Sequence, residues 1–270
     1  MQIVFLLIMS ERKKYIYTKL DDLCNSFSIS CINFNLFNLT PALDWFSIAS
    51  KINSVDYDTW KYNDLMGLCE SADDYDKEKG KSDKEIVENL VRFTFIWSGI
   101  ESLILILKIK NHPRFAGKIN AATTLIKEKL EGERFCRCAY LNLVDKLKIL
   151  LKESEIHLPE FKNVDAFSPL GEGIQIVYQI RNNFAHGTFN FPEPDGWNIR
   201  NVVEQQILKI ASYITIITAQ FLIISVYKDE DLIAFAYDDK SDNEIELKLF
   251  KHFHQLHFNY VVPEKASKVA

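Results

Sequence analysis

Hydrophobic positions recur at helical spacing through the middle of the chain. From Ile86 to Leu107 they return every three or four residues, the period of one helix face. Ser82, followed three residues later by Glu85, is typical of a capping box at a helix start, and Pro113 predicts its end. The polar run 73–84 contains Gly80 and predicts a linker or exposed loop before this helix.

Further helices are predicted on both sides of this one. Thr40 as the N-cap and Pro41 at the first position predict a short helix near the start. Gly187 is placed as the C-terminal cap of a late helix. Apolar spacing and breakers predict helices over residues 115–130, 135–152, 171–186 and about 195–227.

The pattern predicts an all-α protein, an antiparallel bundle of about five helices with additions at both ends. Residues 1–81 are expected to form an N-terminal appendage of mixed structure, and 82–227 the bundle. Residues 228–270 are expected to hold a short β-hairpin and a tail, because apolar and charged residues alternate over 244–249. The hydrophobic share of 47 % and the 19 Phe can support a large core.

The stretch from Ile210 to Tyr227 carries no charged residue, which leaves two interpretations. It lies at the lower edge of membrane-span length, and a buried central helix of a bundle explains it equally well. The polar residues within it and the ordinary soluble composition favour the second, so no membrane association is expected. The five Cys are odd in number and form no C-x-x-C pair, which favours reduced thiols and a cytoplasmic location.

The formal net charge of -5 argues against a protein coated in basic residues for nucleic-acid binding. Residues 108–152 are the exception, with eleven basic and four acidic residues. Such a segment is usually a solvated helix face. If it borders a catalytic site, it would attract RNA.

The segment from Tyr178 to Gly187 carries the candidate chemistry. Arg181 offers a planar, permanently charged donor fork for phosphate, and His186 can exchange protons near neutral pH. Asn182 and His186 share a helix face, whereas Arg181 and His186 lie about 140° apart around an ideal helix. Two copies of the segment meeting across a two-fold axis would form one composite cleft. The simpler interpretation is that both side chains cap helix carbonyls or pair with solvent.

This segment resembles the Arg-x4-His signature of the HEPN superfamily (higher eukaryotes and prokaryotes nucleotide-binding domain), with Arg181, the polar Asn182 and His186 matching it. Trp97 and Glu101 similarly resemble the Trp-x3-Glu helix of some bacterial members tied to phage defence. The resemblance covers about residues 84–227.

The resemblance implies a metal-independent endoribonuclease that works as a cytoplasmic homodimer without a cofactor. An RNA 2′-hydroxyl would attack the adjacent phosphodiester, with His186 as general acid or base and Arg181 stabilising the phosphate charge. Asn182 would orient the histidine or the phosphate, Glu101 would hold Arg181, and Asn183 would support the site. Implied partners are RNA, a second copy of the chain and an antitoxin or defence partner, as for a toxin or antiviral effector. The alternative is a non-catalytic helical module that binds a protein partner or a nucleotide.

Other candidate sites have weaker patterns. His252, His254 and His257 could offer metal ligands, but no Cys or carboxylate accompanies them at a known spacing. Cys136 and Cys138 have the wrong spacing for a zinc knuckle or a redox pair. The chain has no phosphate-binding loop, no dinucleotide-binding fingerprint and no His-Glu-x-x-His, so common nucleotide-dependent enzymes and zinc hydrolases lose support.

Overall fold

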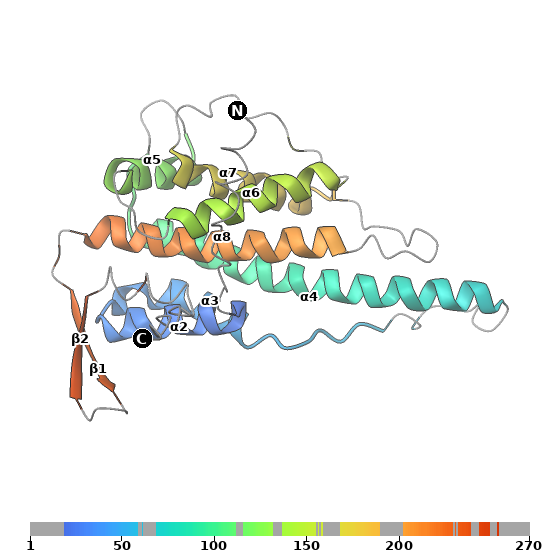
Figure 1. Cartoon of the computed structure of the whole chain (residues 1–270), viewed down its shortest axis with the longest axis horizontal. Coiled ribbons are helices and arrows are strands. Elements are labelled where there is room, and N and C mark those ends of the chain that lie inside the picture. Colours follow the sequence, from blue (N-terminus) through green and yellow to red (C-terminus); the bar gives the residue numbers. More distant parts are fainter. Residues whose placement is uncertain are drawn as a thin grey trace, which may run out of the picture.

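The computed structural model of the chain is mostly helical, which confirms the predicted all-α class (Figure 1). It describes residues 19–58, 61, 69–111, 116–131, 137–154, 156, 158, 168–189, 202–228, 230, 232–238, 243–248 and 253. The helices in chain order are α2 (Leu20–Asn33), the 3-10 helix η1 (Phe37–Leu39), α3 (Thr40–Ser50), α4 (Glu70–Ile106), α5 (Lys118–Leu130), α6 (Arg137–Glu153), α7 (Pro169–Ala185) and α8 (Val202–Tyr227).

The longest helix, α4, begins at Glu70, well before the predicted cap at Ser82. Its N-cap is Cys69, whose extended backbone places its carbonyl to accept from the N–H groups of Ala72 and Asp73, both at 3.0 Å. The predicted loop over 73–84 and the predicted capping box are therefore wrong, because Ser82 is a buried residue inside the helix. The expected boundary between residues 81 and 82 falls within α4.

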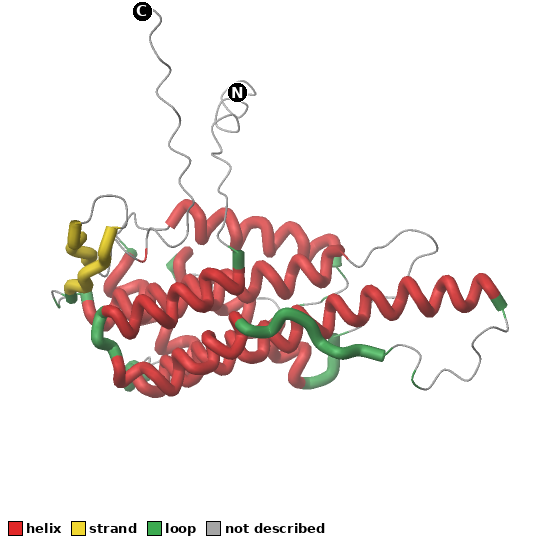
Figure 2. Tube along the Cα trace, turned by 90° about the horizontal axis from the view of Figure 1, so that it is seen from below, coloured by secondary structure: helices red, strands yellow, loops and turns green. Residues whose placement is uncertain are grey.

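A loop contacts α4 at the end of this polar stretch. Residues 51–58 run alongside the middle of α4 (Figure 2). The backbone N–H of Val55 donates to Glu88 at 3.3 Å, and the hydroxyl of Tyr57 donates to Asp83 at 3.5 Å. Gly80 is buried. Long-range contacts thus support a helix that the local pattern does not predict.

Helix α4 also ends earlier than Pro113 predicted. The N–H of Leu107 bonds the carbonyl of Leu103 at 2.9 Å, and that of Lys108 bonds Leu105 at 3.1 Å. Lys108 adopts a left-handed conformation, with φ of 50°. The helix is therefore closed by a left-handed residue at the position where glycine is commonest.

Helix α8 forms the centre of the core. Three of its buried hydroxyl groups are satisfied within the helix: Ser212, Thr215 and Thr218 each donate to the carbonyl four residues earlier, at 2.7–2.9 Å. By length and composition, α4 and α8 could each cross a membrane. In α8, however, 94 % of that apolar window is buried inside the protein, as in the core helix of a soluble domain.

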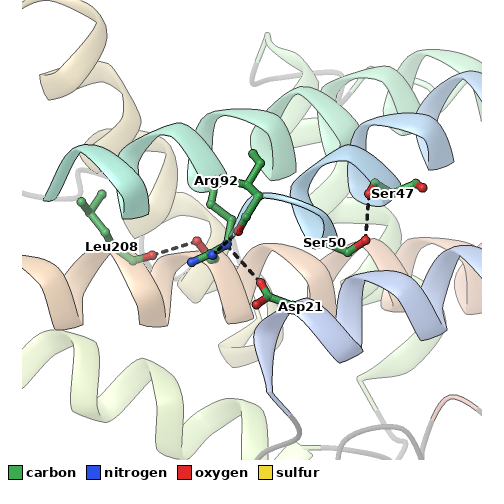
Figure 3. A network of polar contacts seen from close by, with 7 residues as sticks. Asp21, Ser47, Ser50, Arg92 and Leu208 are labelled. Carbon is green, nitrogen blue, oxygen red and sulfur yellow. Dashed lines mark hydrogen bonds and ion pairs between the residues drawn. The ribbon is translucent and has the colours of Figure 1, made fainter. Parts of the chain in front are cut away.

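Helices α2 and α3 share one hydrophobic cluster with α4 and α8. The rings of Phe27 on α2 and Phe46 on α3 meet edge to face, with centroids 5.0 Å apart. Gly99 lets α3 approach α4 closely, since a Cβ there would lie 2.7 Å from the ring of Phe46. Arg92 reaches from α4 to Asp21 on α2 (Figure 3).

Pro41 lies in the first turn of α3, as predicted, but the N-cap is Leu39 rather than Thr40. The Thr40 hydroxyl instead donates to the carbonyl of Phe37 at 2.7 Å. Near the other end, strands β1 (Ile233–Asp238) and β2 (Asn243–Lys248) pair antiparallel, with Ile233 opposite Lys248.

Helices α4 and α8 run in the same direction (Figure 1). The two helices pack against each other. Leu107, just after α4, and Val226, near the end of α8, line one groove. Helices α5, α6 and α7 cover the face of this pair opposite α2 and α3 (Figure 1). The motif helix α7 therefore lies on the outside of the bundle, supported by the core.

Candidate functional site

The predicted motif occupies the last turn of α7. This helix starts after Ser168, with Pro169 at its first position, and its apolar face is buried (Leu170, Ile174, Val177 and Ile180). It ends at Ala185, with His186 as the C-cap. Gly187 follows with φ of 66°, a conformation that L side chains rarely adopt, so it is the predicted glycine cap.

The residues around this helix end hold it in one conformation. The N–H of Thr188 donates to the carbonyl of Asn183 at 2.9 Å, and its hydroxyl donates to the Asn183 side-chain oxygen at 3.2 Å. The rings of Phe184 and Phe189 stack with centroids 4.0 Å apart. Asn183 therefore bonds the turn that carries His186.

Arg181 and Asn182 are half-buried neighbours that form one polar pair. The guanidinium of Arg181 donates to the side-chain oxygen of Asn182 at 3.3 Å. The expected ion pair between Arg181 and Glu101 is not formed, since within the described part of the chain neither residue makes a salt bridge. Glu101 is half-buried on α4. The structure brings Arg181 together with Asn182 and leaves Glu101 without the predicted role in one chain.

The side chain of His186 is exposed. Its backbone N–H bonds the carbonyl of Asn182 at 2.9 Å. Among the described residues, its imidazole makes no hydrogen bond or ion pair. Both ring nitrogens are therefore open to a substrate or to a second chain. Chemically, the helix end offers one cation, one amide and one unengaged proton-transfer group.

One aromatic contact beside the motif was missed by the sequence reasoning. Trp97 on α4 and Tyr178 on α7 stack with centroids 6.0 Å apart and planes 20° apart. Trp97 is 3 % exposed, whereas Tyr178 is 38 % exposed. Tyr178 precedes Arg181 and Asn182 by three and four residues, so all three lie on one face of α7. This i, i+3, i+4 spacing is the sequence feature that could have identified Tyr178 as a neighbour of Arg181 and Asn182.

The basic segment contributes a separate groove of about 360 Å³ at the far end of α4. Its lining includes Lys108, Lys110, Asn111, Thr124, Glu128 and Val226. Neither Arg181, Asn182 nor His186 lines it. One further lysine of the segment, Lys148, pairs with Glu172 on α7 at 2.5 Å. Lys108 and Lys110 therefore line a groove that does not include the motif residues, and Lys148 forms an ion pair.

Within the described ranges, no group of three or more His, Cys, Asp or Glu side chains is arranged to hold a metal ion. His252, His254 and His257, and the side chains of Cys136 and Cys138, lie outside the described residues. Cys24 and Cys31 are buried free thiols, and burial raises the pKa of both. Cys69 is exposed, and hydrogen bonds from the backbone N–H groups of Ala72 and Ser71 lower the pKa of its thiol.

Comparison with family models, curated proteins and solved structures finds no match to this chain.

Proposed function

We propose that the chain is a metal-independent, HEPN-type endoribonuclease whose active site is completed by a second copy of the chain. The observation that carries the proposal is the end of α7, where Arg181 and Asn182 form a polar pair and His186 is exposed and makes no side-chain bond to the described residues. The rigid turn made by Asn183, Gly187 and Thr188 supports it, because proton transfer requires a fixed imidazole position.

In the proposed reaction the RNA 2′-hydroxyl attacks its own phosphorus. The 2′-oxygen–phosphorus bond forms and the bond from phosphorus to the 5′-oxygen breaks, which leaves a 2′,3′-cyclic phosphate and a 5′-hydroxyl. One His186 takes the proton from the 2′-hydroxyl or gives one to the departing 5′-oxygen. Arg181 neutralises the charge that builds on the non-bridging oxygens.

A second copy supplies what one chain lacks. No hydrogen bond joins Arg181 to His186 within the described part of the chain, and the two residues diverge around α7. A two-fold axis beside this helix end would place the arginine of one chain near the histidine of the other. As a toxin or defence effector, such an enzyme would also be held in check by an antitoxin or a defence partner.

The direct test is cleavage of single-stranded RNA by the purified chain in excess chelator. Wild type is expected to leave 2′,3′-cyclic phosphate ends and to spare RNA that is 2′-O-methylated throughout. His186→Ala should slow cleavage by roughly 10²- to 10⁴-fold. Lys152→Ala, which removes an exposed cation from α6, is the matched control and should be as active as wild type. Absence of cleavage by wild type, or full activity of His186→Ala, refutes the proposal.

Mixing two inactive variants tests the shared site. Arg181→Ala and His186→Ala each lack one group, but a mixed dimer contains one site with both groups intact. Co-refolded protein should therefore recover on the order of a quarter of wild-type activity if the site is composite. If both groups act within one chain, the mixture stays inactive.

A non-catalytic binding module is the second candidate. The hydrogen bond from Arg181 to Asn182 favours it, because a guanidinium held by an amide can bind a phosphate without any proton transfer. This candidate predicts RNA or nucleotide binding that Arg181→Ala weakens, with no cleavage by wild type.

A further inference from the structure

We infer that Tyr178 is a stacking platform for a base of single-stranded RNA, next to the scissile phosphate. The inference rests on the proposed ribonuclease function and adds the form of its substrate. It starts from Tyr178, an aromatic ring of α7 that is 38 % exposed and lies one helix turn before Arg181 and Asn182.

The position of Tyr178 matches the dimensions of a nucleotide. It lies three and four residues before Arg181 and Asn182, which corresponds to about 4.5–6 Å along the helix. A ring one helix turn from a phosphate-binding pair is therefore within reach of a base attached to that phosphate. Base edges and faces are accessible in this way only when the RNA is unpaired.

The ring of Tyr178 is supported from behind. Trp97 packs against it at 6.0 Å and is itself almost fully buried, so the tyrosine ring is held rather than free to rotate. Phe93, one turn earlier on α4, supports Trp97 in turn, with centroids 6.3 Å apart. A ring that is already ordered loses little conformational entropy when a base stacks on it.

Stacking on the Tyr178 ring favours RNA binding that does not depend on the base sequence. Every base offers a flat face to an aromatic ring, and such stacking is sequence-tolerant. One turn before Tyr178 on α7, Gln175 is buried and donates to Asn120, whereas one turn after it Arg181 and Asn182 suit phosphate rather than a base edge. The site should therefore bind unpaired RNA and read little of its sequence.

The experiment uses the full chain and two non-cleavable, fluorescein-labelled probes. One is a hexamer of 2′-O-methyl adenosine, and the other is the same backbone with abasic sugars. Tyr178→Ala should weaken binding of the adenosine probe by roughly 5- to 100-fold and leave the abasic probe unchanged. Tyr178→Phe should bind both probes like wild type, whereas Arg181→Ala should weaken both.

Tyr75→Ala is the matched control. Tyr75 is similarly exposed at 40 %, and it lies about 33 Å along α4 from Trp97, the residue that packs against Tyr178. Equal effects of Tyr178→Ala on both probes, or no effect on either, would overturn the inference. So would loss of the dimer in Tyr178→Ala by light scattering, which would place the ring between two copies, or wild-type binding of neither probe.

The two proposals fail separately. Cleavage of RNA by wild type together with unchanged probe binding by Tyr178→Ala would remove the platform and keep the enzyme. Base-dependent binding without cleavage would keep the platform and remove the enzyme.

Discussion

Nε of Arg92 lies 3.1 Å from Oδ1 of Asp21, and this ion pair joins α4 to α2 (Figure 3). The Arg92 side chain is only 16 % exposed, while that of Asp21 is 43 % exposed. The same guanidinium donates to the carbonyl of Ile52, so it also fastens the segment that runs along α4.

Removing one partner should therefore cost more than an exposed surface pair does. Arg92→Met is expected to lower the free energy of unfolding by about 1–3 kcal/mol. This lies between the values for breaking an exposed ion pair and a fully buried one. Asp21→Asn should cost less, because its carboxylate is partly in water and Arg92 keeps the bond to Ile52. Urea denaturation of the two single variants and the double variant gives the coupling energy. A coupling of zero would show that the pair contributes nothing.

Ser82 distinguishes the observed helix from the one predicted by its sequence. If Ser82 were an N-cap, its replacement by alanine would lower the free energy of unfolding by about 0.5–2 kcal/mol. In the structure its hydroxyl is buried inside α4 with no hydrogen-bond partner among the described residues. Ser82→Ala is therefore expected to leave stability unchanged or to raise it. Thermal denaturation checks this, and a clear loss of stability would restore the capping role.

Helices α6 and α7 approach each other closely at Gly173. A Cβ at this site would lie 2.5 Å from the hydroxyl of Tyr140 and 2.7 Å from Val144, and Tyr140 is completely buried. Gly173→Ala gains about 1 kcal/mol in helix propensity but is expected to lose about 1–3 kcal/mol by overpacking. A net loss of stability by denaturant titration is expected. Ala substitution of the exposed Thr94 is the control and should be nearly neutral.

The cysteines should react in a fixed order with iodoacetamide. Backbone N–H groups at the start of α4 lower the pKa of Cys69, so its thiolate forms at a lower pH than in an ordinary thiol. Burial raises the pKa of Cys24 and Cys31, so both stay protonated as the pH rises through that range. Peptide mass mapping at pH 7–8 should show Cys69 modified first and the other two only after unfolding. Modification of Cys24 at the same rate would contradict the buried packing of α2.

Local pattern was enough to predict the helices that pack through one apolar stripe. The predicted ranges for α5, α6 and α7 begin and end within about three residues of the observed ones, as expected for such segments. The start of α4 was misplaced because residues 73–84 are polar, and the partners of Asp83 and Glu88 belong to a distant segment.

The candidate site was predictable in its residues but not in their contacts. The spacing of Arg181, Asn182 and His186 placed them at a helix end, which the structure has. Arg181 bonds Asn182 rather than Glu101, and Trp97 lies behind Tyr178. Both contacts depend on how α4 and α7 are placed relative to each other. No local pattern carries that information.

The burial of α8 has a consequence for how the chain folds during synthesis. Helices α2 to α7 leave the ribosome first, yet they share a single hydrophobic cluster whose centre is α8. Until residues 202–227 emerge, the apolar faces of α4 and α6 have no central helix to cover them. The nascent chain therefore exposes apolar surface until α8 has been synthesised. Packing of α8 then completes the hydrophobic core.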